Sequence, residues 1–278
     1  LDATPNTMTI DVTSVNDAPA GTDTTVTTNE DTAYTFTAAN FGFTDTSDVP
    51  ANLLMAVTIS SLPASGSLLL NGVAVTLNQS ITAADLNAGL LTYAPPLNAH
   101  GAGYANFTFQ VQDGGGTANL GQDIDQSANT MTVNVTSVND APEGTDTTVT
   151  TLEDTAHVFT VADFGLTDAN DSPADALLSV TIDTLPLNGS LTLNGLAVTA
   201  GQMVLATDIT AGLLVFAPVP NQNGPGYADF TFRVQDSGGT LSGGIDTDAT
   251  PNTMTVNVTS VNDAPEGTDT TVTTLEDT

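Results

Sequence analysis

The sequence predicts an all-β protein, built as tandem antiparallel Greek-key β-sandwiches that follow one another end to end. An internal repeat and a period-two alternation of apolar residues are the main observations behind this prediction. The segment Val-Thr-Ser-Val-Asn-Asp-Ala-Pro occurs three times, at 12–19, 135–142 and 258–265. The repeat length is 123 residues, from 139 minus 16 and from 262 minus 139, and the intervening stretches align without a gap.

The repeat divides the chain into domain-sized pieces, because 123 residues is the length of a whole domain rather than of a solenoid turn. Two complete units are predicted, at 20–142 and 143–265. Residues 1–19 match 247–265 and are predicted to be the last strand of a preceding module. Residues 266–278 match 143–155 and are predicted to be the first strand of a following module. We therefore expect the chain to be part of a longer array.

Alternation within each unit is typical of strands with one buried and one solvated face. Apolar residues occupy every second position of 107–111 and 131–135, and Thr and Val predominate, as a half-buried pleated surface favours. The alternation predicts which side chains point inward: Phe107, Phe109, Met131 and Val133. It places Thr108 and Thr132 on the outer face.

Turn signals separate these strands. Asn71-Gly72 joins two apolar runs within 66–77, and the pair supplies the positive φ angles that a type I′ hairpin turn requires. The same hairpin is predicted at 189–198. The spacing of turns predicts about seven or eight short strands per unit, which is the pattern of a sandwich. One helical turn is expected at 82–86, and no long helix.

The composition excludes several classes of protein. One Lys or Arg against 32 Asp and Glu gives a formal net charge of −31. Phosphate-directed nucleic-acid binding needs clustered cations, so it is excluded, and docking on anionic lipid is disfavoured. There is no Cys, so no disulfide stabilises the fold. No apolar run approaches the roughly 18 residues of a membrane span, and 40% hydrophobic residues argue against disorder.

Several motifs resemble those of the cadherin family. Asn-Asp-Ala-Pro resembles the linker between cadherin modules, and Glu-Asp-Thr, at 30–32 and 153–155, resembles the end of the first strand. Thr-Asp-Ala-Asn-Asp at 167–171 resembles an Asp-x-Asp loop, and Val-Gln-Asp-x-Gly resembles a late strand end. The repeated Leu-Pro-x-x-Gly-x-Leu-x-Leu-Asn-Gly pattern is most similar to cadherin-like repeats of large secreted bacterial adhesins, including RTX-type adhesins. The resemblance covers both units.

The resemblance implies an Ig-like or cadherin-like fold with Ca²⁺ between modules. Calcium takes six to eight oxygen ligands, which carboxylate, amide and backbone groups supply. The resemblance gives three ligand sets. The upstream linker would use Asn16, Asp17, Asp45, Asp48 and Asp113. The linker between the two units would use Glu30, Asn139, Asp140, Asp168, Asn170, Asp171 and Asp236. The downstream linker would use Glu153, Asn262 and Asp263. Ser47 stands where the second unit has Asn170, so the upstream site is expected to be weaker.

Other interpretations of these residues stay open. Asp, Asn and Gly are also ordinary turn residues that form local hydrogen bonds. His100 and His157 have no second His or Cys that would complete a transition-metal site. No nucleophile elbow or phosphate-binding loop is present, and no catalytic residue is predicted, so we expect no enzyme activity.

The leading functional hypothesis is a structural one. The chain is interpreted as extender modules of a bacterial surface or secreted adhesin, outside the cell, with neighbouring modules of the same chain as its direct partners. Cell-surface or glycan ligands would bind through other domains, and neither nucleic acid nor membrane insertion is expected. A glycan-binding module remains an alternative, with Tyr104 and Tyr227 as its candidate residues. A polymerising filament or surface-layer subunit, which would donate its terminal strands between chains, is another.

Overall fold

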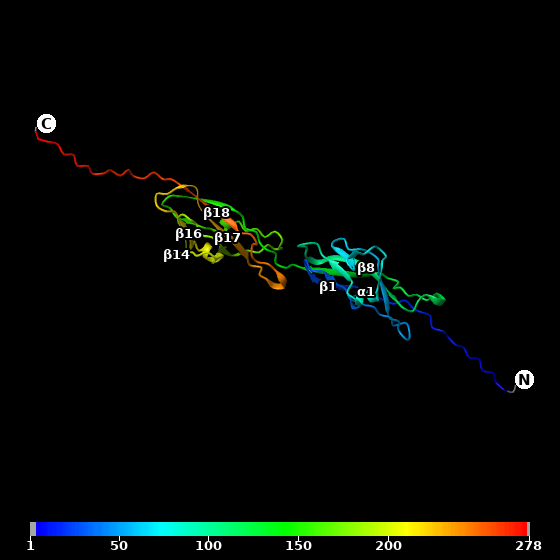
Figure 1. The fold of residues 1–278 in the computed structure, drawn as a ribbon. Helices are drawn as coiled ribbons and strands as arrows, with labels where there is room; N and C mark the ends of the chain where they lie inside the picture. Colours follow the sequence, from blue (N-terminus) through cyan, green and yellow to red (C-terminus); the bar gives the residue numbers. More distant parts are fainter. Residues whose placement is uncertain (1–3, 277–278) are drawn as a thin grey trace. The chain divides into compact units, whose positions relative to one another are not determined.

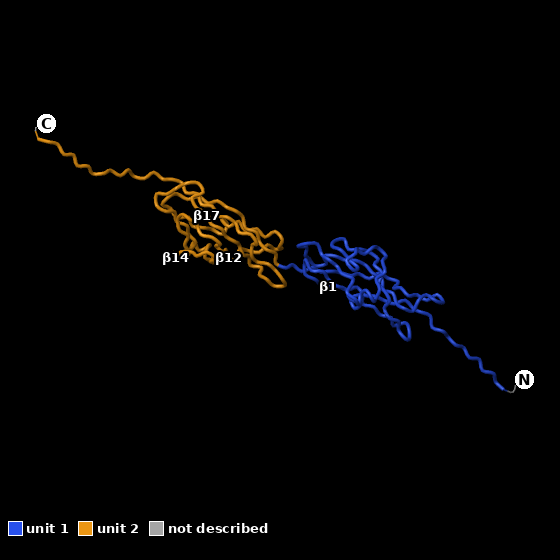
Figure 2. Tube along the Cα trace, in the orientation of Figure 1, with its two compact units in different colours: residues 1–138 blue, residues 139–278 orange. Residues whose placement is uncertain are grey.

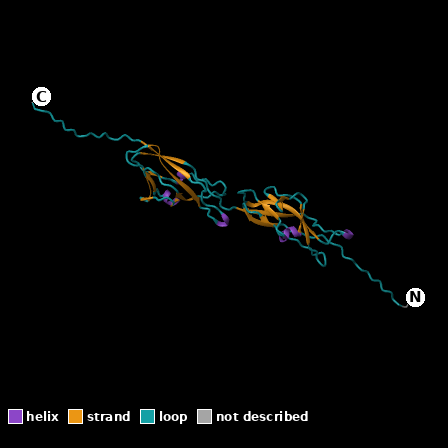
Figure 3. Ribbon diagram, in the orientation of Figure 1, coloured by secondary structure: helices purple, strands orange, loops and turns teal. Residues whose placement is uncertain are grey.

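The computed structural model describes residues 4–276, and the chain divides into two compact units (Figure 2). Unit 1 comprises residues 1–138 and unit 2 residues 139–278. Each unit is almost entirely strand and loop, with only short helical turns (Figure 3). None of the helices in the described part is long and apolar enough to span a bilayer.

Unit 1 consists of two facing sheets (Figure 1). The five-stranded sheet has the order β1-β9-β8-β3-β6 and the four-stranded sheet the order β2-β7-β4-β5. The strands are β1 Thr24–Asn29, β2 Tyr34–Thr35, β3 Leu54–Ile59, β4 Ser67–Leu70, β5 Val73–Ala74, β6 Ser80–Thr82, β7 Leu91–Ala94, β8 Gly101–Asp113 and β9 Asn129–Thr136. The helical turns are η1 Ala38–Phe41, α1 Ala83–Asn87 and η2 Ala118–Leu120.

Unit 2 repeats this topology, with sheets β10-β18-β17-β12-β15 and β11-β16-β13-β14. Its strands are β10 Thr147–Leu152, β11 His157–Val158, β12 Leu177–Ile182, β13 Ser190–Leu193, β14 Leu196–Ala197, β15 Gln202–Leu205, β16 Leu214–Ala217, β17 Gly224–Asp236 and β18 Asn252–Thr259. Its helical turns are η3 Val161–Phe164, α2 Ala206–Thr210 and η4 Leu241–Gly243. The β-sandwich prediction is confirmed in both units.

One strand pair differs from the antiparallel prediction. The first strand of each unit pairs in parallel with the last one, from Thr24↔Met131 to Asn29↔Thr136 in unit 1. Every other pairing between the described strands is antiparallel. Parallel strands need a long crossover, and here the whole sandwich lies between β1 and β9. The two strands therefore end at the same pole of the unit.

The predicted phase of the strands is confirmed. Phe107, Phe109, Met131 and Val133 are fully buried in the core of unit 1. Thr108 and Thr132, which alternate with them, are only half-buried. Unit 2 has an equivalent core that includes Phe230, Phe232, Met254 and Val256. Each unit thus buries its own apolar cluster.

The predicted turns are also present. Asn71 and Gly72 have φ angles of 50° and 76° and connect Leu70 to its partner Val73, as a type I′ hairpin requires. The helical turn expected at 82–86 is α1. The Thr82 hydroxyl caps it by accepting a hydrogen bond from Asp85 N at 3.1 Å.

The terminal segments contain no strand in the described residues. Residues 5–19 and 260–275 are irregular, and Met8 is 85% exposed whereas its repeat equivalent Met131 is 0% exposed. Residues 1–3 and 277–278 of the predicted terminal strands lie outside the described residues. The assignment of 1–19 and 266–278 to neighbouring modules stays a prediction, because the strands that would pair with them belong to those modules.

Candidate metal centre at the poles of each unit

Strand ends and loops gather carboxylates at the pole of unit 2 where its chain begins. Asp236 is the last residue of β17, and Asp168 and Asp171 lie in the loop before β12. The segment that begins with Asn139 and Asp140 runs past them toward β10. All three carboxylates are buried, which is uncommon for acidic side chains without a partner of opposite charge.

Hydrogen bonds tie the Asn-Asp pair to these carboxylates. Asn139 Nδ2 donates to both oxygens of Asp236, at 3.2 and 3.4 Å, and to Ile245 O at 2.7 Å. Asp140 N donates to Asp171 Oδ2 at 2.9 Å. These hydrogen bonds bring Asn139 to Asp236 and Asp140 to Asp171, and Asp168 lies beside Asp171; their assignment as ligands stays a prediction.

A third carboxylate, Asp175, joins Asp168 and Asp171. One oxygen from each of the three lies within 4.8 Å of the others. Asp175 N donates to Asp168 Oδ2 at 2.5 Å, and Ser237 Oγ donates to Asp175 Oδ1 at 3.1 Å. Asp168 is 7% exposed, and its Oδ1 has no hydrogen-bond partner among residues 4–276. Two buried acids and the partly buried Asp175 therefore lie close together, and one carboxylate oxygen among them has no hydrogen-bond donor.

Sequence reasoning missed Asp175. It follows Asp171 by four residues and has no place in the Asp-x-Asp motif. The available signal was its repeat equivalent, Asn52, because both units carry an oxygen-bearing side chain there. Only the folded loop shows that this side chain returns to the motif.

Unit 1 has the same arrangement at its corresponding pole. Asn16 Nδ2 donates to Asp113 Oδ1 at 3.1 Å and to Gln122 O at 2.7 Å. Asp17 N donates to Asp48 Oδ2 at 3.0 Å. Asp45 is buried and its Oδ1 also lacks a hydrogen-bond partner in the described part of the chain. The five predicted residues of the upstream set are therefore close together.

The two predicted glutamates lie at the opposite pole of their own units. Glu30 follows β1 and is 3% exposed, and its Oε1 accepts a hydrogen bond from Val138 N at 2.5 Å. Glu153 accepts from Val261 N at 2.6 Å in the same way. Each glutamate therefore binds the valine that directly precedes an Asn-Asp pair.

The second carboxylate oxygen of each glutamate has a side-chain neighbour that the sequence did not predict. His100 Nδ1 lies 3.2 Å from Glu30 Oε2, and Asn223 Nδ2 donates to Glu153 Oε2 at 2.8 Å. His100 and Asn223 are equivalent in the repeat, so the contact is a feature of both units.

Three predicted ligands are not brought into a cluster within their own unit. Asn170 is exposed and lines a pocket of about 560 Å³ together with Asp140 and Glu143. Asn262 and Asp263 are exposed in the segment after β18, where Asn262 Nδ2 donates only to Asp263 O, at 3.2 Å. Their assignment as ligands stays a prediction.

The electrostatics of the unit 2 cluster oppose full ionisation. Burial raises the pKa of Asp171 to about 6; the hydrogen bond from Asp140 N lowers it, and the negative charge of Asp168 raises it further. Burial also raises the pKa of Asp236, against the hydrogen bonds from Gly238 and Asn139. A cation in the cluster would reverse this effect, since it favours the charged form of each acid.

The chemistry of the donor set fits a hard cation. Carboxylate and amide oxygens are what calcium prefers, and no imidazole or thiol is among the clustered groups. The orphaned buried oxygens Asp45 Oδ1 and Asp168 Oδ1 supply a physical reason for an ion, because a buried acceptor without a donor is costly.

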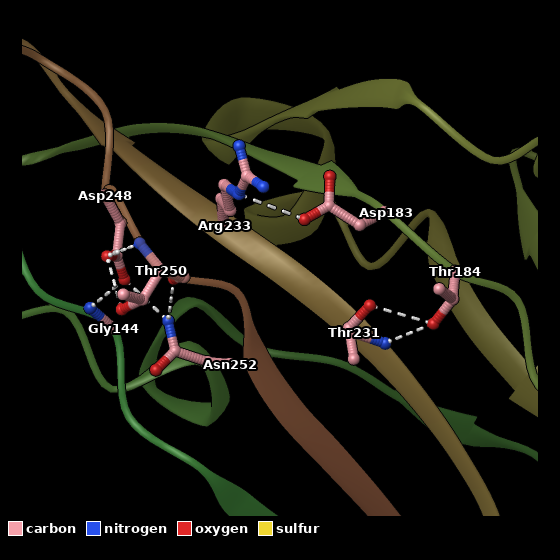
Figure 4. Close-up of polar contacts among 8 residues, drawn as sticks. All are labelled: Gly144, Asp183, Thr184, Thr231, Arg233, Asp248, Thr250 and Asn252. Atoms are coloured by element: carbon pink, nitrogen blue, oxygen red, sulfur yellow. Dashed lines mark hydrogen bonds and ion pairs between the residues drawn. The ribbon is translucent and has the colours of Figure 1, made fainter.

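Asp248 is a further buried acid that the sequence did not single out, and its surroundings are of another kind (Figure 4). Its oxygens accept hydrogen bonds from Gly144 N at 2.9 Å, Thr250 N at 2.9 Å and Asn252 Nδ2 at 2.6 Å. Asp125 has equivalent partners in unit 1. The oxygens of these two carboxylates already accept hydrogen bonds that hold neighbouring segments together, so they need no ion.

The residues named for other functions have structural surroundings. Tyr104 and Tyr227 pack against the cores of their units, and the Tyr227 hydroxyl donates to Gln222 Oε1 at 3.1 Å. His157 packs edge-on against Phe159, with ring centroids 4.8 Å apart. The Arg233 side chain is partly exposed, with its Nε 3.2 Å from Asp183 Oδ2 (Figure 4).

Comparison with known proteins gives only structural neighbours. No protein-family model matches the chain, and no curated protein matches it. Among solved structures it is similar to human mucin-like protocadherin EC1-2, with 15% identity, TM-score 0.43 and coverage of 87% of this chain and 98% of the other. It is similar to protocadherin gamma B2 domains 3–6, with 14% identity, TM-score 0.45 and coverage of 88% and 53%. Mouse cadherin-23 EC22-24 follows, with 12% identity, TM-score 0.43 and coverage of 87% and 67%.

Proposed function

We propose that this chain is a stretch of extender modules from a long bacterial adhesin, secreted or displayed on the cell surface, and that Ca²⁺ stiffens it where successive units meet. The role is mechanical: the modules would hold a distal binding domain away from the cell. The proposal includes no catalysis.

The observation that carries this proposal is the way in which the linker is anchored on both sides. On one side Glu30, at the end of β1, holds Val138 N within unit 1. On the other side Asp236 and Asp171 hold Asn139 and Asp140 within unit 2. Consecutive residues of the chain are thus bound by buried carboxylates of different units, which supports the proposal that the linker is where an ion acts.

Under this proposal, each ion draws ligands from two modules. At the linker between the units they would be Glu30 from unit 1 and Asn139, Asp140, Asp168, Asn170, Asp171 and Asp236 from unit 2. Asn16, Asp17, Asp45, Asp48 and Asp113 would serve a preceding module in the same way, and Glu153, Asn262 and Asp263 a following one. The net charge of −31 supports a need for cations, because self-repulsion opposes close approach of acidic modules.

Affinity in the extracellular range fits this role. Extracellular calcium modules bind with dissociation constants of roughly 10⁻⁴ to 10⁻³ M. Such sites are filled outside the cell and empty in the cytosol. The array would therefore stiffen only after export.

Small-angle scattering of the whole chain tests the mechanism. We expect the maximum dimension of the wild type to fall when calcium is removed by a chelator, because the linker then bends. Asp140→Ala should show the short dimension even in calcium, whereas Asp229→Asn, an exposed acid on β17, should behave as the wild type. If the wild type has the same profile with and without calcium, stiffness comes from protein contacts alone and the mechanism is wrong.

A further inference from the structure

Besides Ser47 and the exposed Asn170, the acidic poles of the two units differ at two positions whose side chains are hydrogen-bonded to each other in unit 2. Asn52 in unit 1 corresponds to Asp175 in unit 2, and Gly114 corresponds to Ser237. The remaining carboxylates of the poles are the same in both, at Asp45 and Asp168, Asp48 and Asp171, and Asp113 and Asp236. The change therefore replaces an amide with a fourth carboxylate beside these three.

In unit 1 the amide of Asn52 closes the arrangement. Asn52 Nδ2 donates to Asn16 Oδ1 at 2.6 Å and lies 3.4 Å from Asp48 Oδ2. The oxygen of Asn16 therefore has a donor, and the amide provides it without any ion.

In unit 2 the same position holds an acceptor. A Cβ atom built on Gly238 would lie 1.6 Å from Asn139 Oδ1 and 2.7 Å from Asp175 Oδ2. On the equivalent Gly115 it would lie 1.6 Å from Asn16 Oδ1 and 2.7 Å from Asn52 Nδ2. The geometry is thus conserved while the donor is lost, and Asn139 Oδ1 is buried without a hydrogen-bond partner among the residues that the structure describes.

Rotating the Asn139 amide does not resolve this. Its Nδ2 already donates to Ile245 O at 2.7 Å and contacts Asp236. A flipped amide would turn its oxygen toward these acceptors and lose both interactions. The space next to Gly238 is therefore bordered by two oxygens, Asn139 Oδ1 and Asp175 Oδ2, and a cation there would give the orphaned amide oxygen a partner.

We infer that the pole of unit 2 holds a calcium subsite that unit 1 lacks, with Asp175 Oδ2 and Asn139 Oδ1 among its ligands. Asp168 and Asp171 add negative charge beside Asp175, since one oxygen from each of the three carboxylates lies within 4.8 Å of the others. Asp168 Oδ1 is a buried, orphaned oxygen that both poles share, because its equivalent Asp45 Oδ1 is orphaned as well. In unit 1 the Asn52 amide fills the equivalent space, so the two poles differ in calcium affinity.

Ser237 is a positioning residue for this subsite. Its Oγ accepts a hydrogen bond from Ala176 N at 3.3 Å and donates to Asp175 Oδ1 at 3.1 Å, which leaves Oδ2 for the ion. Unit 1 has neither group: Asn52 stands in place of the carboxylate, and Gly114 has no hydroxyl that could orient one. A Cβ atom on Gly114 would meet only Leu53 O, at 3.8 Å, so a serine fits there.

Calorimetric titration of the whole chain with CaCl₂ tests the inference. The wild type should show a tighter and a weaker class of sites. D175N/S237G copies the pole of unit 1 into unit 2 and should weaken the tight class by about tenfold, since ligand charge sets calcium affinity. N52D/G114S makes the reverse change and should add sites to the tight class. S237G alone should weaken binding less than the double variant, and D229N should match the wild type.

The outcomes separate this inference from the proposed function on which its choice of calcium rests. If wild type binds calcium but the D175N/S237G and N52D/G114S isotherms overlay it, the inference is overturned and the stiffening mechanism is untouched. If the isotherms shift as expected but scattering shows no calcium-dependent dimension, the subsite stands and the stiffening mechanism falls. If the wild type binds no calcium, both fall.

Discussion

Asp171 and Asp248 lie in the same unit, yet their surroundings move their pKa values in opposite directions. Burial raises the pKa of Asp171 to about 6, and its acidic neighbours add to this. Burial would also raise the pKa of Asp248, but the hydrogen bonds from Gly144, Thr250 and Asn252 outweigh it and hold the pKa below its usual range. The hydrogen-bond donors around a buried carboxylate thus decide its role. A carboxylate with enough donors holds chain segments together, and one with too few is a candidate cation ligand.

The pKa of Asp171 predicts an unusual pH dependence in calcium-free buffer. A carboxyl group with a raised folded-state pKa destabilises the fold when ionised, so stability should increase as the pH falls from about 6 toward 3.8, the usual value for Asp. The melting temperature should therefore increase from pH 7 to pH 5 by a larger amount in the wild type than in D171N, which has no titrating group at position 171. An equal change in both proteins would contradict the prediction. In the presence of calcium the wild type should instead be less stable at pH 5 than at pH 7, because protons compete with the ion for the carboxylates.

At the scale of elements, the segment before β10 is fastened to the loop before β18 by one side chain. Asp248 connects the nearby Thr250 and Asn252 to Gly144, which is 104 positions away in the sequence. Removing this acceptor leaves the buried Asn252 Nδ2 and two part-buried backbone N–H groups without their partner. That is costly, whereas the loss of a surface ion pair is not.

We expect D248A to lower the free energy of unfolding of unit 2 by about 2–3 kcal/mol, the cost of leaving buried donors without an acceptor. The matched control is D183A, which removes the partly exposed pair with Arg233 shown in Figure 4 and should cost less than about 1 kcal/mol. Urea denaturation measures both. Comparable losses of unfolding free energy in D248A and D183A would show that the hydrogen bonds of Asp248 do not stabilise unit 2.

For the whole molecule, the balance of charge determines how strongly calcium acts. An ion that binds only the folded chain stabilises it by mass action, by about 2.7 kcal/mol at 100 times the dissociation constant. We expect 10 mM calcium to raise the melting temperature clearly above that in chelator. Sodium chloride of matched ionic strength screens the net charge of −31 without filling the sites, so it should give a smaller rise. Identical melting curves in calcium and sodium chloride would exclude specific binding.

The sequence by itself determined the repeat, the sandwich and the inward phase of the strands. These follow from local patterns: alternation every second residue places Phe107 and Phe109 inside, and Asn71-Gly72 makes its turn wherever it lies. It also placed Asn139, Asp140, Asp168, Asp171 and Asp236 at one pole, because strand ends and turns are where such residues occur.

Only the tertiary structure decided which of these atoms face one another. Asp175 lies outside every motif and reaches Asn139 because the loop before β12 folds back, and the equivalent contact in unit 1 joins residues 36 apart in the chain. The parallel pairing of β1 with β9 likewise joins strands at the two ends of a unit. Hydrogen-bond donors and acceptors act over about 3 Å in space whatever their separation in sequence. A local pattern therefore gives the kind of residue at a pole, and the fold decides whether an oxygen there meets an amide or another oxygen.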